Sequence, residues 1–317
     1  MPIVRMFQQT IGSRVYFEGI GVHSGLPVQL TLLPAEVNTG IVFHLCDKQG
    51  YLHEIKALTG NAAPMDLATV VGDPRGAHVA TIEHLMAALY AMGVDNVVVQ
   101  LDAHETPIMD GCAAAFIKGI READVVGQSA RARYVRVLKP VSVEMNGARA
   151  EYLPHNGTRF EIEIDFATPA IGRQVYKADL TAERFARDLS RARTFGFMKD
   201  VERLWAAGSA LGSSLDNSVV IGDDGRVINP DGLRYDDEFV RHKALDAVGD
   251  QALAGARVLG CYRSYRGGHK LNGLALQALL ADRRAYEIVE APSRRVDPVR
   301  HAPLVAVAAP AYGPQTL

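Results

Sequence analysis

Residues 236–282, DDEFVRHKALDAVGDQALAGARVLGCYRSYRGGHKLNGLALQALLAD, decide the fold of this chain. Helical periodicity predicts a helix over 236–250, and an apolar run predicts a strand over 256–265. After a pair of glycines, periodicity returns and predicts a second helix over 270–282. The stretch therefore orders a helix, a strand, a loop and a helix.

The first half of the chain has the same order of elements. A helix is expected over TIEHLMAALYAM at 81–92, with Thr81 as its N-cap and Gly93 as its stop. A buried strand is expected over 94–102 and a second helix over 112–123. The two halves therefore predict a duplicated α+β unit by order of elements, although no residue-level repeat is evident.

Short strands are expected elsewhere. Alternating runs such as PVQLTLLP at 27–34 predict strands in the first 80 residues, and Asn-Gly pairs at 146–147 and 156–157 predict hairpins, so that strands near 134–166 form a meander. Helices are expected over 181–192 and 198–207, followed by a strand at SVVIG. The polar stretch GQSARAR at 127–133 is a candidate domain boundary.

Length and composition describe a packed, two-domain protein. At 317 residues the chain exceeds the roughly 250 residues at which single cores stop growing. Hydrophobic residues make up 48% and charged residues 22%, and the net charge of −2 provides no general attraction for nucleic acid. Cys46, Cys112 and Cys261 lie far apart without a CxxC pair, which argues against a disulfide framework or a thiolate metal site.

A cytoplasmic location is expected. The first residues, MPIVRMFQQTIGSR, lack the apolar stretch and cleavage site of a secretory signal. No run approaches the roughly 18 apolar residues that span a bilayer. We also expect a monomer.

One helix carries a polar stripe with metal-ligand spacing. In EFVRHKALDAVGD, His242 and Asp246 are four residues apart and project from the same helix face, where both can bind Zn²⁺. Asp250 continues the stripe and Lys243 adds a cation on a neighbouring face. The same pattern also fits a hydrogen bond on a helix surface or a solvated outer face.

Four further residues have side chains suited to catalysis or metal binding. Glu83 and His84 are adjacent on an apolar helix, so one can bind a metal while the other reaches a bound water. His269 follows two glycines at a strand-to-helix junction, a good place for an acid or for a turn-capping histidine. Thr194 offers a hydroxyl beside Phe195. For Glu83 and His84, the structural alternative is a buried, hydrogen-bonded His or an exposed Glu. For Thr194 and Phe195, it is an ordinary edge strand or turn.

As an ordered set, the motifs resemble the lipid A deacetylase family LpxC. The resemblance runs from about residue 8 to about residue 287 and rests on the following motifs: GIGVHSG at 19–25, TIEHLMAAL at 81–89, PIMDG at 107–111, RARTFGF at 191–197, SLDN at 214–217, EFVRHKALDAVGD at 238–250 and GGHKLN at 267–272. The tail after about 287 has no match in the family, and the loop around His104 and Glu105 is of a variable kind.

The resemblance implies two α+β domains of similar topology. Each is a sheet with a helical layer, and the helices pack between the sheets. The expected bounds are 1–127 and 134–287, with a β-α-β insert at about 195–222 and a peripheral tail at 288–317. The active site is expected at the junction of the two domains.

The resemblance also assigns roles. His84, His242 and Asp246 would hold Zn²⁺, although Fe²⁺ suits the same ligands. Glu83 resembles the general base and His269 the partner acid. Three further residues have implied catalytic roles. Asp250 would hold the ring of His269, and Thr194 would donate a hydrogen bond to the oxyanion. Lys243 would lie near the polar groups of the substrate.

The implied substrate is UDP-3-O-[(R)-3-hydroxyacyl]-N-acetylglucosamine, a lipid A precursor of Gram-negative lipopolysaccharide, which loses its N-acetyl group. Phe195 would pack against the sugar, and the insert would form a passage for the acyl chain. The expected lining residues are Phe197, Leu204, Trp205, Ala210 and Leu211, which equally fit an ordinary amphipathic core.

Two rival interpretations stay open at this point. A different zinc hydrolase, such as a peptidase, uses the same ligand types, but the sequence contains no HExxH motif. A noncatalytic relative would lack a ligand or the base, whereas Glu83, His84, His242, Asp246 and His269 are all present.

Overall fold

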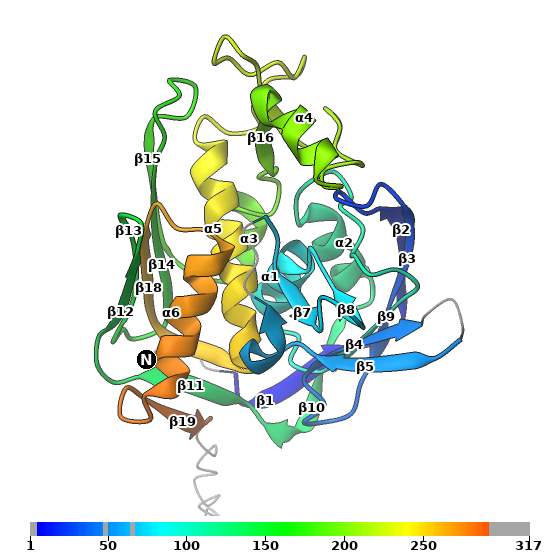
Figure 1. Ribbon diagram of the computed structural model, residues 1–317. Coiled ribbons are helices and arrows are strands. Elements are labelled where there is room, and N and C mark those ends of the chain that lie inside the picture. Colours follow the sequence, from blue (N-terminus) through cyan, green and yellow to red (C-terminus); the bar gives the residue numbers. More distant parts are fainter. Residues whose placement is uncertain (1–4, 47–49, 64–66, 292–317) are drawn as a thin grey trace, which may run out of the picture.

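Helices lie between two large sheets in the computed structural model, which describes residues 5–46, 50–63 and 67–291 (Figure 1). The chain is therefore a mixed α+β protein, as predicted. Much of its buried apolar surface forms one cluster that includes side chains of both sheets and of the helices between them. Burial of this surface is the main term that stabilises the arrangement.

The first sheet comes from the first 101 residues. Its strands, in spatial order, are β2 (Val15–Ile20), β3 (Pro27–Pro34), β9 (Val97–Leu101), β4 (Ile41–Cys46) and β5 (Leu52–Lys56). Strand β9 pairs antiparallel with β3 and parallel with β4. Along β3, Val28, Leu30 and Leu32 are buried, because alternate side chains face the helices.

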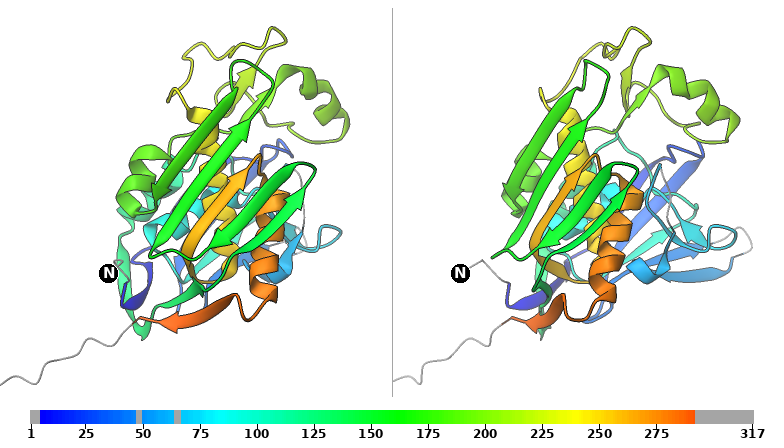
Figure 2. Two further views of the ribbon diagram at one scale, coloured as in Figure 1. Left: turned by 90° about the vertical axis from the view of Figure 1, so that its left-hand side faces the viewer. Right: turned by 60° about the vertical axis from the view of Figure 1, so that its left-hand side comes forward.

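The second sheet has the same pairing pattern along five of its seven strands. These are β12 (Val141–Met145), β13 (Ala148–Leu153), β18 (Arg257–Tyr265), β14 (Thr158–Asp165) and β15 (Arg173–Asp179), completed by β11 (Arg133–Val137) and β19 (Tyr286–Glu290). Strand β18 pairs antiparallel with β13 and parallel with β14, as β9 does with its neighbours. Figure 2 shows this sheet with helices behind it.

The predicted meander over 134–166 is wrong in one place. The Asn146-Gly147 hairpin joins β12 to β13, as expected. Strands β13 and β14, however, do not pair across Asn156-Gly157, because β18 from a distant part of the sequence lies between them. A turn signal is local, whereas β18 satisfies the backbone hydrogen bonds of both strands.

Five helices make up most of the layer between the sheets. They are α1 (Glu83–Met92), α2 (Ala114–Glu122), α3 (Ala182–Asp188), α5 (Glu238–Gln251) and α6 (His269–Ala281). Helices α1 and α5 approach closely, since a Cβ atom at Gly249 would lie 2.0 Å from the carbonyl oxygen of Glu83. Only glycine permits this approach, which brings the polar stripe of α5 against the start of α1.

The prediction for α1 is correct at the C-terminal end of the helix and wrong at its N-terminal end. Gly93 ends the helix with a φ of 83°, a left-handed conformation that glycine adopts without strain. Thr81 is not the N-cap, because the helix begins at Glu83 and Ile82 holds the cap position without a side-chain hydrogen bond. The hydroxyl of Thr81 donates instead to Glu105 Oε1, at 2.9 Å.

The predicted β-α-β insert is present. It consists of β16 (Phe195–Phe197), α4 (Met198–Ala206) and β17 (Val219–Ile221), with β16 and β17 parallel, and it lies at the top of Figure 1. The remaining elements are β1 (Phe7–Ile11), β10 (Val125–Arg131), β6 (Ala62–Ala63), β7 (Val70–Gly72), β8 (His78–Val79) and 3-10 turns at Thr59–Asn61 and Ala252–Ala254.

Two predicted boundaries coincide with strands. The polar stretch at 127–133 overlaps β10, which pairs with β1. Strand β19 extends to Glu290, so the first three residues of the expected tail pair with β11, and residues 292–317 lie outside the described residues. Among the described helices, none has the length and apolar character needed to cross a membrane.

Candidate metal centre and active site

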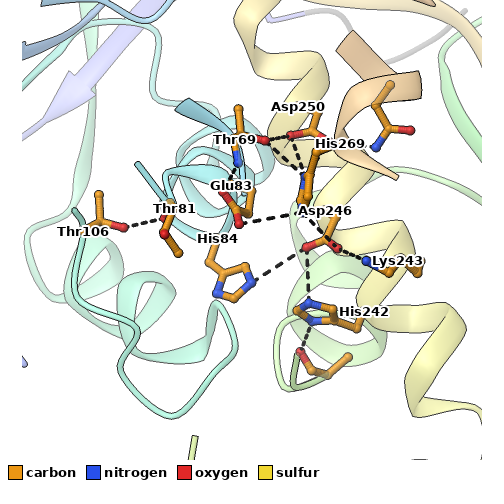
Figure 3. Close-up of polar contacts among 12 residues, drawn as sticks. Thr69, Thr81, Glu83, His84, Thr106, His242, Lys243, Asp246, Asp250 and His269 are labelled. Atoms are coloured by element: carbon orange, nitrogen blue, oxygen red, sulfur yellow. Dashed lines mark hydrogen bonds and ion pairs between the residues drawn. The ribbon is translucent and has the colours of Figure 1, made fainter. Parts of the chain in front are cut away.

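The start of α1 is held by hydrogen bonds from the segment at 105–106. Thr81 adopts a φ of 58°, an uncommon conformation for a β-branched residue. Its carbonyl accepts from Thr106 Oγ1 at 2.5 Å and its hydroxyl donates to Glu105, and these bonds offset the strain. The first turn of α1 then places Glu83 and His84 in the interior (Figure 3), where both are buried.

The polar stripe of α5 faces the interior. His242, Asp246 and Asp250 are at most 3% exposed. A solvated outer face is therefore excluded as an explanation of the stripe. Buried polar groups need partners, and the partners here come from α1 and α6.

Three side chains converge with metal-binding geometry. The candidate ligand atoms of His84, His242 and Asp246 all lie within 4.8 Å of one another. Asp246 Oδ1 is 3.7 Å from His84 Nε2 and 3.3 Å from His242 Nε2. Two atoms bound tetrahedrally to one Zn²⁺ lie roughly 3.3 Å apart. The arrangement therefore fits a small divalent ion.

An unsatisfied buried oxygen supports the same conclusion. Among the described residues, Asp246 Oδ1 finds no hydrogen-bond partner, whereas Oδ2 accepts from Lys243 Nζ at 2.9 Å. The ring of His242 is oriented by a contact of 3.0 Å between Nδ1 and the carbonyl oxygen of Ala192, which leaves Nε2 facing Asp246. Such an outer contact is typical of metal-binding histidines.

The electrostatics keep the ligands in their metal-binding forms. Burial, and next the proximity of His242, lower the pKa of His84 to about 3. Burial also lowers the pKa of His242. Burial alone would raise the pKa of Asp246, but His242 and Lys243 hold it well below its usual range. Neutral imidazoles and an ionised carboxylate are the forms that bind a cation.

A carboxyl group and an imidazole face each other beside this cluster. Glu83 Oε1 lies 3.7 Å from His269 Nε2, which is 3.8 Å from Asp246 Oδ2. Burial raises the pKa of Glu83 to about 7, the range that suits a general base near neutral pH.

His269 is held as a cation. Its Nδ1 lies 3.0 Å from Asp250 Oδ2. Burial opposes the charge, but Asp250 and next Glu83 raise the pKa of His269 to about 10. An imidazolium at this position has a proton to donate at neutral pH.

Lys243 and Phe195 lie at the edge of the cluster. Lys243 Nζ is bound to Asp246, which raises the lysine pKa against the effect of burial. The same ammonium lies 5.5 Å from the centre of the Phe195 ring, and that ring is 6.3 Å from the ring of His242. The Phe195 ring therefore lies beside both Lys243 and the metal-ligand candidate His242.

Thr194 is placed by a buried ion pair. The preceding residue, Arg193, makes a bidentate contact with Glu238 at 2.9 and 3.1 Å, and its backbone N–H donates to the same carboxylate. The backbone N–H of Thr194 donates to Gly111 at 2.8 Å. Glu238 begins α5, so the pair ties Thr194 to the helix that carries His242.

We expect Glu238→Gln to destabilise the protein. Arg193 is 6% exposed and Glu238 is fully buried, so the change leaves an uncompensated buried charge, at a cost of about 3–5 kcal/mol. Urea unfolding measures this free energy. The exposed Glu122→Gln, whose carboxylate pairs with Lys118 on α2, is the control and is expected to cost under about 1 kcal/mol.

The cost of Glu238→Gln also depends on pH. Burial alone would raise the pKa of Glu238, but hydrogen bonds from Arg193 hold it below the ordinary value of 4.5. A carboxyl whose pKa is lowered by folding stabilises above its unfolded pKa, and this stabilisation is lost as pH falls through the folded value. The difference between wild type and variant should be constant above about pH 5 and shrink at lower pH. A constant difference would contradict this assignment.

The predicted passage residues lie on the insert but differ in exposure. Phe197, Leu204 and Ala210 are half-buried, whereas Trp205 and Leu211 are 54% and 52% exposed. The insert is fastened to the loop at 21–25, because the backbone N–H of Leu211 donates to the carbonyl of His23 at 3.1 Å.

Three buried residues near the site are not among the site residues predicted from the sequence. Glu105 accepts from the backbone N–H groups of His23 and Ser24, which fastens the loop at 21–25 to the start of α1. Asn272 donates to Asp250 at 2.7 Å, and Thr69 donates hydrogen bonds to both Glu83 and Asp250. Only Asn272 had a sequence signal, since it lies within GGHKLN.

A buried cluster of two histidines and one aspartate, beside a carboxyl group and an imidazolium, is an arrangement that a metal-dependent hydrolase uses. The family model described as LpxC, UDP-3-O-acyl N-acetylglycosamine deacetylase, matches residues 8–281. The chain belongs to this family. The predictions of a deacetylase of lipid A biosynthesis and of zinc as its cofactor are thereby confirmed.

Individual relatives cover nearly the whole chain. The UDP-3-O-acyl-N-acetylglucosamine deacetylases of Brucella ovis, Brucella canis and Brucella melitensis are each 53% identical over 285 residues. The matched region is 90% of this chain and 99% of each relative. The region matched by the family model includes α1, α5 and α6, the helices that contribute to the site.

Proposed function

We propose that this chain hydrolyses the N-acetyl group of UDP-3-O-[(R)-3-hydroxyacyl]-N-acetylglucosamine, with Glu83 as general base and His269 as general acid. The observation that carries the proposal is the convergence of these two groups with the His84, His242 and Asp246 cluster. Side chains from α1, α5 and α6 meet within hydrogen-bonding or ion-pair distance there (Figure 3).

Glu83 takes a proton from the attacking water. Burial keeps its pKa near 7, so the carboxylate form is available and is basic enough to accept the proton. Its Oε2 accepts from the backbone N–H of Thr69 at 2.9 Å, which leaves Oε1 facing the site. When bound by His84, His242 and Asp246, Zn²⁺ supplies Lewis-acid polarisation of the carbonyl and acidifies the water.

His269 gives its Nε2 proton to the departing nitrogen as the C–N bond breaks. The products are acetate and the amine of the sugar. The contact with Asp250 keeps the ring charged until that step, and the same charge stabilises the developing oxyanion. An amine is a poor leaving group without this proton.

The remaining side chains bind and orient the substrate. The hydroxyl of Thr194 donates a hydrogen bond to the oxyanion. Lys243 attracts polar groups of the substrate, and Phe195 packs on the sugar ring. The short distances from Phe195 to Lys243 and His242 support this arrangement. Each donor aimed at the oxyanion contributes roughly 3 kcal/mol in related chemistry.

The insert contacts the acyl chain through Phe197, Leu204, Trp205, Ala210 and Leu211. Trp205 and Leu211 are exposed on the insert, and Leu26 is exposed on the neighbouring loop. Apolar side chains grouped at a surface are typical of a site that binds an apolar ligand.

We also propose that residues 1–127 and 134–287 are domains of related topology, with the site at their junction. The shared pairing patterns around β9 and β18 support this. The ligands support it too, because His84 comes from the first domain and the other two from the second. The chain acts in the cytoplasm as a monomer.

Substrate scope tests the proposed function. We expect the purified protein to release acetate from the acylated UDP-sugar and to leave N-acetylated peptides intact, because the insert and Phe195 bind groups that peptides lack. Acetate release measured with both substrates decides the question. Cleavage of peptides with no turnover of the nucleotide sugar would overturn the assignment.

A further inference from the structure

Thr69 is a buried residue with its main chain fixed to the start of α1. It precedes β7 and is 7% exposed. Its backbone N–H donates to Glu83 Oε2 at 2.9 Å, and its carbonyl accepts from the backbone N–H of Ile82 at 3.3 Å. The peptide groups of Thr69 therefore hold one oxygen of the Glu83 carboxylate in place.

The side chain of Thr69 reaches the opposite partner. Its hydroxyl donates to Asp250 Oδ1, and its oxygen lies 3.1 Å from His269 Nδ1 (Figure 3). The other oxygen of Asp250 accepts from Asn272 at 2.7 Å and contacts His269 Nδ1 at 3.0 Å. The Asp250 carboxylate is thus held from both sides, and its rotation is restricted.

We propose that Thr69 is a positioning residue that sets the geometry between Glu83 and His269, an inference that rests on the roles proposed for these two residues. Thr69 and Glu83 come from the first half of the chain, whereas Asp250 and His269 come from the second. One residue bonded to both sides fixes the 3.7 Å separation between Glu83 Oε1 and His269 Nε2. Proton transfers are sensitive to such distances.

The two contacts make different demands on the residue at this position. Any residue except proline provides the backbone N–H for Glu83, but only a hydroxyl at Cβ reaches Asp250. Valine has nearly the shape of threonine and lacks the hydroxyl, whereas serine keeps the hydroxyl and lacks the methyl group. These two substitutions therefore separate hydrogen bonding from packing.

Thr69→Val should lower kcat by roughly 10- to 100-fold while KM and bound Zn²⁺ stay within about twofold of wild type. Thr69→Ser should recover kcat to within about threefold of wild type. Steady-state kinetics on the acylated UDP-sugar, with metal analysis of the same preparations, measures all three quantities.

Thr10→Val is the matched control. Thr10 is 6% exposed, close to the 7% of Thr69, and its hydroxyl accepts a hydrogen bond from the backbone N–H of Ala35 at 3.1 Å, on β1 and away from Glu83 and His269. We expect the kcat of this variant to stay within about twofold of wild type. A loss of kcat in Thr10→Val equal to that in Thr69→Val would show that any lost buried hydroxyl loosens the protein, and it would overturn the proposal.

Two other outcomes would also overturn it. One is a Thr69→Val protein with wild-type kcat, and the other is a Thr69→Ser protein as impaired as Thr69→Val. If the valine variant does not fold, Thr69→Ala also removes the hydroxyl, and its kcat is compared with that of Thr69→Ser in the same way. Wild-type turnover in the assay reports on the proposed function, whereas the ratio of variant to wild-type kcat reports on Thr69.

Discussion

Replacing Glu83 by glutamine should lower kcat by roughly 10²- to 10⁴-fold, the usual contribution of a general base. Glutamine keeps the size of the side chain and an acceptor for the backbone N–H of Thr69, but it cannot take a proton from water. The metal ligands His84, His242 and Asp246 are unchanged, so we expect Zn²⁺ to stay bound. Kinetics and metal analysis of the same preparation separate the two effects.

Glu151→Gln is a suitable control for this experiment. Glu151 is also buried, at 8% exposure, but it pairs with Arg149 and Arg263 on the second sheet, away from the site. We expect that variant to keep kcat within about twofold of wild type. Normal turnover in Glu83→Gln with intact Zn²⁺ would rule out Glu83 as the base.

Removing the metal should abolish activity, and Zn²⁺ should restore it. His84, His242 and Asp246 are the candidate ligands, and the unpartnered Asp246 Oδ1 has no other described role. Dialysis against a strong chelator, followed by acetate assays with and without added Zn²⁺, tests this expectation. Fe²⁺ added anaerobically tests whether the same ligands accept it. Full activity of a metal-free preparation would refute the mechanism.

A stability measurement provides a second readout for the metal. A ligand that binds only the folded state stabilises it by about 2.7 kcal/mol at 100 times its Kd. Zn²⁺ should therefore raise the Tm of the metal-free wild type. It should raise the Tm of Asp246→Asn much less, because an amide is a poor ligand for a divalent cation. Equal Tm shifts in both proteins would contradict the assignment of Asp246.

Sequence patterns predicted the structure correctly where interactions within one short segment decide its conformation. Strand β3 has the predicted bounds, Gly93 ends α1 as expected, and the order of helix, strand and helix is found in both halves. These features depend on side-chain periodicity and on the conformational freedom of glycine, both of which are visible in the sequence.

Errors arose where distant segments compete with local signals. The Asn156-Gly157 pair resembles a hairpin turn, but β18, about 100 residues later, takes the position between β13 and β14. Thr81 resembles an N-cap, but its hydroxyl bonds to Glu105 instead. In both cases a long-range partner replaces the local one.

The sequence by itself determined the helices, many of the strands, the polar stripe of α5 and, through its ordered motifs, the family. Only the tertiary structure decided that the stripe is buried, that Gly249 lets α5 approach α1, and that Thr69 bonds to both Glu83 and Asp250. The physical reason is that periodicity sets which side chains share a face, whereas close packing between distant segments sets what that face contacts.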